Sequence, residues 1–208
     1  MSITVDIFAL GPLETNCYVL RSYQQCWVID PGIGIWPVLQ HLKQANLTPT
    51  RILLTHGHGD HIAGCDELRK EWPGLKVACS AADAPMLTDP ALNVSAMFGL
   101  PLQVAAADEF IEPGQTLQLG AAQVHVLDTS GHSPGGLSFY VPSIRAVFTG
   151  DALMDGGVGR TDMPGCSGEK LLDNIRKHLL TLPDDTRVFG GHGNSSTIGL
   201  EKVDNPYL

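Results

Sequence analysis

The feature that most constrains this chain is the run HGHGDH at residues 56–61, in which three histidines and an aspartate fall within six positions. With 8 histidines among 208 residues, such a run is expected by chance in fewer than roughly one chain in a thousand. Imidazole and carboxylate groups bind zinc, iron and manganese, and the two intervening glycines let a tight loop direct alternate side chains at one point. The alternative is a solvated loop whose aspartate caps a helix. The run predicts a metal site with four candidate ligands: His56, His58, Asp60 and His61.

Three further residues extend this site. His132 lies in TSGHSPGG and His192 in FGGHGN, each in a glycine-rich loop. Asp151, in FTGDAL, closes an apolar run, where a buried charge is costly unless a metal ion compensates it. Five histidines and two aspartates are too many ligands for one tetrahedral ion and suit two ions that share a bridging carboxylate. The sequence therefore predicts a binuclear centre.

Hydrophobic periodicity places these clusters at the ends of strands. Helices are expected near residues 37–42, over 62–72 and after Ser167 as N-cap, with a weaker helix at 81–87. Residues 88–108 are expected to form a long loop with a helical turn near Met97 and Phe98. Strands are expected at 3–7, 17–21, 26–30, 51–55, 75–79, 115–119, 123–127, 137–141, 146–149 and 187–189. Loops at strand ends commonly carry functional groups, so the clusters are expected to converge at one edge.

Composition excludes several classes of protein. The chain has 43% hydrophobic and 17% charged residues, which fits a single domain over residues 1–208. A net charge of −9 without a basic stripe argues against nucleic-acid binding. No apolar run approaches the roughly 18 to 20 residues that a membrane span needs, and Asp6 and Glu14 interrupt the N-terminus, so neither a membrane partner nor a signal peptide is expected. Five scattered cysteines suit a reducing compartment, and a cytoplasmic location is expected.

The motifs resemble those of the metallo-β-lactamase superfamily of hydrolases, above all the glyoxalase II (hydroxyacylglutathione hydrolase) branch and its short bacterial relatives. The matching stretches are LLTHGHGDHIAG, TSGHSPGG, FTGDAL, GGVGRTD, GGHGNSSTIGLE and NPYL. The resemblance implies a mixed α/β (α+β) fold, a four-layer αββα sandwich with a binuclear site at one edge. It implies two divalent transition-metal ions, zinc first and iron or manganese as alternatives. His56, His58 and His132 would hold the first ion and Asp60, His61 and His192 the second, and Asp151 would bridge them.

This resemblance predicts a metal-dependent hydrolase that cleaves thioesters of the hydroxyacylglutathione type through a metal-bridged hydroxide. Asp60 and Asp151 are the expected catalytic residues, and the substrate is a small thioester or ester. The chain ends soon after His192, where glyoxalase II enzymes continue into a helical domain that helps to bind glutathione. Arg160 is the candidate substrate-binding residue and would bind the thiol half of the substrate. The alternative is a surface ion pair of Arg160 with Asp162 or Glu169 and no role in binding.

Other functions on the same scaffold stay open. A persulfide dioxygenase would use one iron ion, and a lactone or carboxylic ester hydrolase would use the same site. A β-lactamase is disfavoured, because Asp151 occupies the position at which the related B1 enzymes use cysteine. A non-catalytic binding or electron-transfer module is also disfavoured, because all seven ligand positions carry residues that can bind metal. The oligomeric state stays open.

Overall fold

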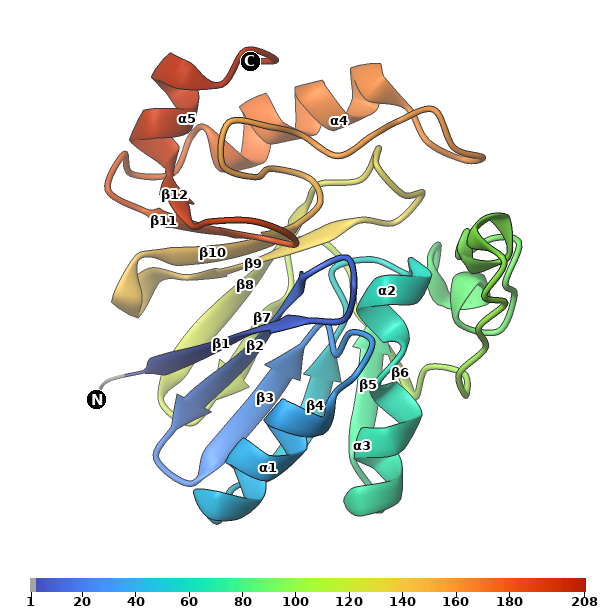
Figure 1. Ribbon diagram of the computed structural model, residues 1–208. Coiled ribbons are helices and arrows are strands. Elements are labelled where there is room, and N and C mark those ends of the chain that lie inside the picture. The colour runs from blue at the N-terminus through green and yellow to red at the C-terminus, as the bar shows by residue number, and fades with distance from the viewer. Residues whose placement is uncertain (1–2) are drawn as a thin grey trace.

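Two six-stranded sheets form the framework of the computed structural model, which describes residues 3–208 (Figure 1). The strand order is β1-β2-β3-β4-β5-β6 in the first sheet and β12-β11-β10-β9-β8-β7 in the second. Helices α1 and α3 cover the outer face of the first sheet, and α4 and α5 lie outside the second (Figure 1). The result is the predicted αββα sandwich.

The strands of the first sheet are β1 (Thr4–Leu10), β2 (Thr15–Ser22), β3 (Gln25–Ile29), β4 (Thr48–Leu53), β5 (Lys76–Cys79) and β6 (Glu109–Phe110). Strands β1 to β3 are antiparallel, and β3 to β6 run parallel. A tight turn at residues 23–24 joins β2 to β3 as a hairpin. Pro49 lies inside β4, beside an irregular step in the pairing of β4 with β3. A proline, which has no N–H to donate, is tolerated at such a position.

The helices of this half are α1 (Trp36–Gln44), α2 (Gly59–Ile62) and α3 (Cys65–Glu71). The helix expected over 62–72 is confirmed over α3, but its start is wrong, because the chain turns at residues 63–64 and Ile62 belongs to the separate helix α2. The N–H of Gly64 donates to the carbonyl of Pro31 at 2.7 Å, and a Cβ at this position would lie 2.7 Å from the Cβ of Ile35. This close approach fixes α2, which carries two of the predicted ligands, against the loop that follows β3.

The second sheet contains β7 (Thr116–Leu119), β8 (Ala122–Asp128), β9 (Leu137–Val141), β10 (Ala146–Gly150), β11 (Arg187–Gly190) and β12 (Ser196–Thr197). Helix α4 (Gly168–Asn174) begins at Ser167, whose side chain accepts from the N–H of Lys170 as expected for an N-cap. A π-helical turn, Ile175–Leu179, continues it. Helix α5 (Ile198–Asp204) was not expected, because few of its residues are buried and its apolar pattern is weak.

The two sheets share a core. Large side chains such as Phe139 and Phe148 are completely buried between them, and Tyr18 packs edge-on against Phe148 at 5.0 Å between ring centroids. Burying such a side chain contributes about 1.5–3 kcal/mol, so the core holds the edges of the two sheets in a fixed relation. Within residues 3–208, the helices are all too short or too polar to cross a lipid bilayer.

Residues 80–108 form a long excursion between β5 and β6. It contains two 3₁₀ turns, Ala84–Leu87 and Ser95–Phe98, so the loop with a helical turn near Phe98 is confirmed. Figure 1 shows this excursion (green) beyond the end of the sandwich on the side of α2. It therefore lies beside the loops that follow the strands.

Candidate metal centre

The predicted ligands all follow strands that end at one edge of the sandwich. The run at 56–61 follows β4, His132 follows β8, Asp151 follows β10 and His192 follows β11. Because the two sheets face each other, these four loops meet. All seven predicted ligand residues are brought together there.

The first ligand set consists of His56, His58 and His132, each nearly inaccessible to solvent. Their nitrogens include a combination within 4.8 Å of one another, close enough to hold a metal ion. The ring centroids of His56 and His58 are 4.9 Å and 4.6 Å from that of His132. Histidines crowded in this way fit neutral imidazoles around a cation.

The second ligand set consists of Asp60, His61 and His192. Oδ2 of Asp60 lies 3.4 Å from Nε2 of His61 and 3.4 Å from Nε2 of His192. These three side chains also come close enough to bind one ion. The alternative, that Asp60 only caps a helix, is wrong, because α2 has no side-chain cap and Asp60 Oδ2 instead accepts from the hydroxyl of Thr15 at 2.9 Å.

Asp151 lies between the two sets. Its Oδ2 is 3.4 Å from Nε2 of His132, in the first set. Its Oδ1 is 3.4 Å from Nε2 of His61 and 3.6 Å from Nε2 of His192, both in the second set. A Cβ at Gly191 would clash with Oδ1, so a glycine is needed for the last loop to come this close. The two oxygens face different sets, which is the arrangement required of a bridging carboxylate.

Unpartnered buried atoms test whether metal ions fit here. Among the described residues, four buried atoms of this cluster have no hydrogen-bond partner: Nε2 of His56, His61 and His132, and Oδ1 of Asp151. Leaving such atoms without a partner is costly, and native proteins rarely do so. All four point into the cluster and are typical ligand atoms of divalent transition metals. The residues fit two such ions.

The protonation states of the first set and of Asp151 suit metal binding, whereas in the second set Asp60 and Asp151 outweigh burial and raise the pKa of His61 and His192, so an ion bound there would displace a proton. Burial, together with the neighbouring His61 and His58, holds the pKa of His56 well below its ordinary value. Burial and the adjacent His132 lower the pKa of His58 to about 3. Burial alone would raise the pKa of Asp151, but His61 and the other histidines lower it well below the ordinary value. Neutral imidazoles and an ionised carboxylate are the forms that ligate metals.

Hydrogen bonds to Nδ1 orient the histidine rings. Nδ1 of His132 donates to the carbonyl of Arg160 at 2.7 Å, and Nδ1 of His192 donates to that of Leu13 at 2.9 Å. Nδ1 of His56 lies 3.0 Å from the hydroxyl of Thr55. A proton held on Nδ1 leaves Nε2 free to bind metal. The loops around the site therefore select one ligand atom on each of these rings.

Asp30 and Asp83 support the site and were not predicted. The buried Asp30 accepts from the N–H and hydroxyl of Thr55, at 2.8 and 2.6 Å, and lies 3.0 Å from Nδ1 of His61. Its oxygens are therefore occupied by hydrogen bonds, and we assign it to orienting His61, although it also lies close enough to His56 and His61 to count as a possible ligand. Like Asp151, it closes an apolar strand, and that signal could have identified it.

Asp83 joins two ligand loops. It accepts from the N–H of Gly57 at 3.1 Å, in the first loop. It also accepts from the hydroxyl of Ser133 and the N–H of Gly135, at 2.6 and 2.7 Å, in the loop of His132. Burial raises its pKa against these hydrogen bonds. Nothing in the local sequence around Asp83 signals this role, which depends on partners 26 to 52 positions away in the chain.

The guanidinium of Arg160 lies apart from the ligands. It is 56% exposed and forms a two-pronged ion pair with Asp162, at 2.7 and 2.8 Å. This is one of the two surface pairings expected from the sequence, and Glu169 is not involved. The main chain of Arg160, in contrast, contacts the site through its carbonyl to His132.

Comparisons with known proteins agree with this geometry. A family model described as "Metallo-beta-lactamase superfamily" matches residues 10–192. The "Probable metallo-hydrolase YqgX" of Bacillus subtilis is 41% identical, with 96% of this chain and 94% of that protein covered. The "Hydroxyacylglutathione hydrolase GloC" of Haemophilus influenzae is 32% identical, with 99% and 98% covered.

Two solved structures share both the fold and part of the sequence. "BLEG-1 B3 metallo-beta-lactamase" superposes with a TM-score of 0.94 at 37% identity, covering 99% of each chain. "TTHA1623 in a di-iron-bound form" superposes with a TM-score of 0.88 at 35% identity, covering 98% of this chain and 100% of that one. With the family model matching most of its length, the chain belongs to the metallo-beta-lactamase superfamily.

Proposed function

We propose that this protein is a binuclear metallohydrolase that cleaves thioesters of the hydroxyacylglutathione type. The observation that carries the proposal is the position of Asp151, whose two oxygens face two separate ligand sets. The relative named hydroxyacylglutathione hydrolase GloC, which aligns over nearly the whole chain, supports this substrate class. We propose zinc as the metal, and the relative crystallised in a di-iron form makes iron the main alternative.

The chain's own residues divide the work of such a reaction. Two bound divalent ions would supply a hydroxide nucleophile at neutral pH and polarise the scissile carbonyl. Asp151 would fix the separation between the two sets. Asp60 is held by the hydroxyl of Thr15 and would orient the attacking group from the edge of the second set. This division gives both expected catalytic residues a role within the ligand cluster.

The absence of a spare proton donor favours thioesters. Within residues 3–208, all seven ionisable side chains of the cluster belong to one of the ligand sets or to the bridge, so the cluster keeps none of them as a general acid. A thiol leaving group has a pKa of about 8.5 and departs as thiolate at neutral pH. An amide would need protonation of its nitrogen. A small thioester is therefore the proposed substrate.

The cysteines support the proposed cytoplasmic location. In the described part of the chain all five are free thiols, four of them buried. Free buried thiols are usual where disulfides do not form.

Metal analysis and a substrate panel test the proposal together. The purified protein is loaded with zinc or with ferrous iron, and metal per chain is measured. The panel contains a hydroxyacylglutathione, an uncharged thioester, a lactone and a β-lactam, the last because one similar structure carries a β-lactamase title. We expect two ions per chain and turnover of the thioesters. One ion with oxygen consumption would replace the proposal with the dioxygenase, and turnover of the β-lactam alone would replace it with a β-lactamase.

A further inference from the structure

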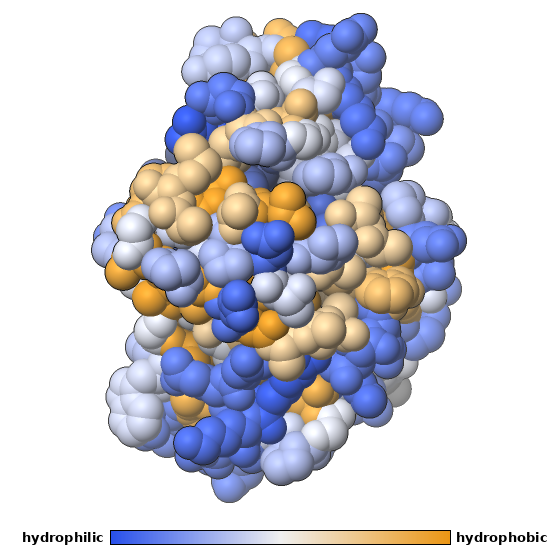
Figure 2. All heavy atoms as spheres, turned by 90° about the vertical axis from the view of Figure 1, so that its right-hand side faces the viewer, coloured by the Kyte–Doolittle hydropathy of each residue, from blue (hydrophilic) through white to orange (hydrophobic). Residues whose placement is uncertain are grey.

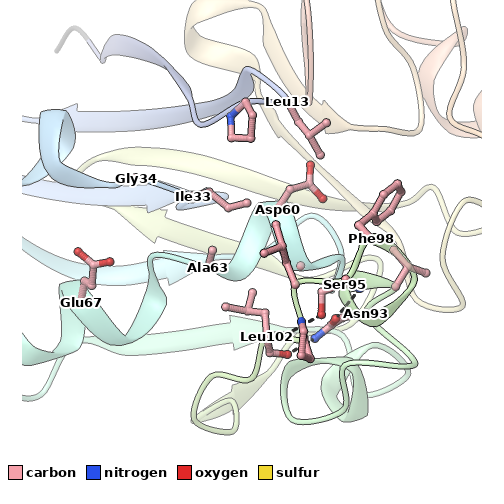
Figure 3. A pocket seen from close by; sticks show the side chains of 16 residues that line it. Leu13, Ile33, Gly34, Asp60, Ala63, Glu67, Asn93, Ser95, Phe98 and Leu102 are labelled. Atoms are coloured by element: carbon pink, nitrogen blue, oxygen red, sulfur yellow. Dashed lines mark hydrogen bonds between the residues drawn. The ribbon is translucent and has the colours of Figure 1, made fainter.

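A pocket of about 590 Å³ opens directly beside the second ligand set (Figure 3). Asp60 belongs both to the pocket wall and to that set. The other walls come from the β1–β2 turn at Leu13, the loop after β3 at Ile33, and residues 93–102. A volume in this range suits a small molecule. A substrate held at the metal centre can therefore extend into the pocket.

The pocket is apolar and open to solvent. Leu13, Phe98 and Leu100 line it, and each exposes more than half of its side chain. Figure 2 shows apolar residues, in orange, gathered at mid-height on the face that carries the 80–108 excursion. Contiguous exposed apolar surface on a soluble fold commonly marks a binding site. Here it adjoins the candidate metal centre.

The charges of the pocket exclude one kind of ligand. Of the 16 lining residues, the only ionisable ones are Asp60 and Glu67, both acidic. Neither lysine nor arginine lines it, so a carboxylate placed there would find repulsion and no partner. An uncharged apolar group would instead bind favourably, because it displaces water from the apolar side chains of the pocket.

The wall formed by residues 93–102 is fixed to the metal-binding helix. The carbonyl of Asn93 accepts from the N–H of Gly59 at 2.9 Å, at the start of α2. The side chain of Asn93 is completely buried and donates to the carbonyls of Met86 and Leu102, at 2.9 and 3.0 Å. A Cβ at Gly59 would lie 3.0 Å from that of Ser95. The wall is therefore attached directly to the helix that carries Asp60.

Val94 adds strain to this wall. Its φ is 58°, a left-handed conformation that is exceptional for a β-branched residue. Strain of this kind persists where the surroundings over-determine the backbone, which is often at functional sites. Val94 lines the pocket, so the strained backbone shapes the proposed binding surface.

The pocket and Arg160 lie on different sides of the bridging Asp151. Arg160 is attached through its carbonyl to His132, which faces Oδ2 of Asp151. The pocket is lined by Asp60, which belongs to the second set. The histidines of that set lie close to the other oxygen of Asp151, Oδ1. A thioester lying across the centre would thus direct its two halves to chemically different surroundings, one with a cation and one without.

We infer that this pocket binds the acyl chain of the substrate and that the enzyme prefers acyl chains that are apolar and longer than a short hydroxyacyl group. The inference rests on the proposed thioester hydrolysis and on the assignment of the thiol half to the side of Arg160. The pocket then determines which acyl group is accepted, while the thiol is recognised elsewhere.

The experiment varies the acyl chain on one small uncharged thiol, N-acetylcysteamine. Metal-loaded protein is assayed with acyl chains of two, four, six and eight carbons. We expect kcat/KM to rise about two- to fourfold for each methylene added, until the pocket is filled. The variant Phe98→Ala should flatten this rise. Met97→Ala is the matched control, because Met97 is adjacent and 66% exposed but does not line the pocket, and it should keep the rise.

A binding measurement separates this inference from the proposed function. Calorimetry with neutral octanamide and butyramide should show tighter binding of the longer amide to the wild type and to Met97→Ala, and loss of this preference in Phe98→Ala. If no thioester is cleaved but the preference is present, the proposed function fails and the pocket assignment stands.

A flat acyl series with active enzyme, or equal effects of the two variants, would overturn the inference. So would a length dependence found only when the thiol chain is lengthened on an acetyl thioester, because the pocket would then hold the thiol half.

Discussion

Oδ2 of Asp30 lies 3.0 Å from Nδ1 of His61, and both side chains are buried. Asp30 also accepts two hydrogen bonds from Thr55, and its backbone has a φ of 50°, unusual for a residue other than glycine. A carboxylate here accepts the Nδ1 proton of His61 and so leaves Nε2 free to bind metal.

The first prediction is that Asp30→Asn weakens the second metal site. The amide nitrogen would face Nδ1 of His61 and favour a proton on Nε2, which blocks that ligand atom. Metal affinity of the second site should fall by about 10- to 100-fold, measured by competition with a chromophoric chelator. Asp6→Asn is the control, since Asp6 pairs with His41 at 3.2 Å on the surface. An unchanged affinity in Asp30→Asn would contradict the orienting role.

The second prediction separates metal chemistry from thiolate chemistry. Asp151→Ala should abolish hydrolysis and reduce metal content, because it removes the group between the ligand sets. Cys166→Ser should retain activity, because a serine hydroxyl can replace the thiol that donates to the carbonyl of His132. Circular dichroism checks that both variants fold. Turnover by Asp151→Ala would place the bridge elsewhere, and an inactive Cys166→Ser would point to a nucleophilic thiolate.

The third prediction concerns the proposed recognition of the thiol half by Arg160. Arg160→Ala should raise KM for a glutathione thioester about 10- to 100-fold with little change in kcat, because a grip that is equal in ground and transition states affects binding only. An uncharged thioester should show no change.

The variant Asp162→Ala complements Arg160→Ala, because it releases the guanidinium of Arg160 from its ion pair. That variant should lower KM for the glutathione thioester. The same loss on charged and uncharged substrates in Arg160→Ala would show that the residue only supports the loop of His132.

The fourth prediction is a pH dependence of stability at Asp108. Partial burial raises the pKa of Asp108 slightly, but the N–H of Val77 and the guanidinium of Arg69 outweigh it, so the folded pKa is lowered. A lowered pKa stabilises the fold above the unfolded value of about 3.9 and loses that contribution as pH falls through the folded pKa. Asp108→Asn should therefore unfold at lower urea concentration at pH 7, with the difference closing below about pH 4.

The exposed helix residue Asp173 supplies the control for this measurement, as Asp173→Asn should change the urea midpoint little at either pH. A difference between Asp108→Asn and the wild type that stays constant down to pH 2 would rule out the proposed ionic origin.

The ligands were predictable because each follows a strand whose apolar pattern is visible in the sequence. His56 and Asp151 come directly after such patterns, and short-range signals suffice to locate them. The break at Gly64 was not predictable, since it depends on a hydrogen bond from the N–H of Gly64 to the carbonyl of Pro31, 33 positions earlier in the chain. Asp83 and Asn93 act through partners distant in the chain, so their roles, and with them the acyl pocket, follow only from the folded structure.

The two ligand sets differ in how they depend on the ends of the chain. The first set comes from the middle of the sequence and is nearly inaccessible. The second set includes His192, whose side chain is 27% exposed. The Nδ1 of His192 donates to the carbonyl of Leu13, 179 positions earlier in the chain. The carbonyl of the neighbouring Gly191 accepts from the N–H of Asn16 at 2.7 Å. Loosening of the terminal strands would open the second set first. The two ions should therefore exchange at unequal rates, with the ion beside Asp60 leaving first, so that scarcity of metal produces a chain with one ion before it produces an empty one.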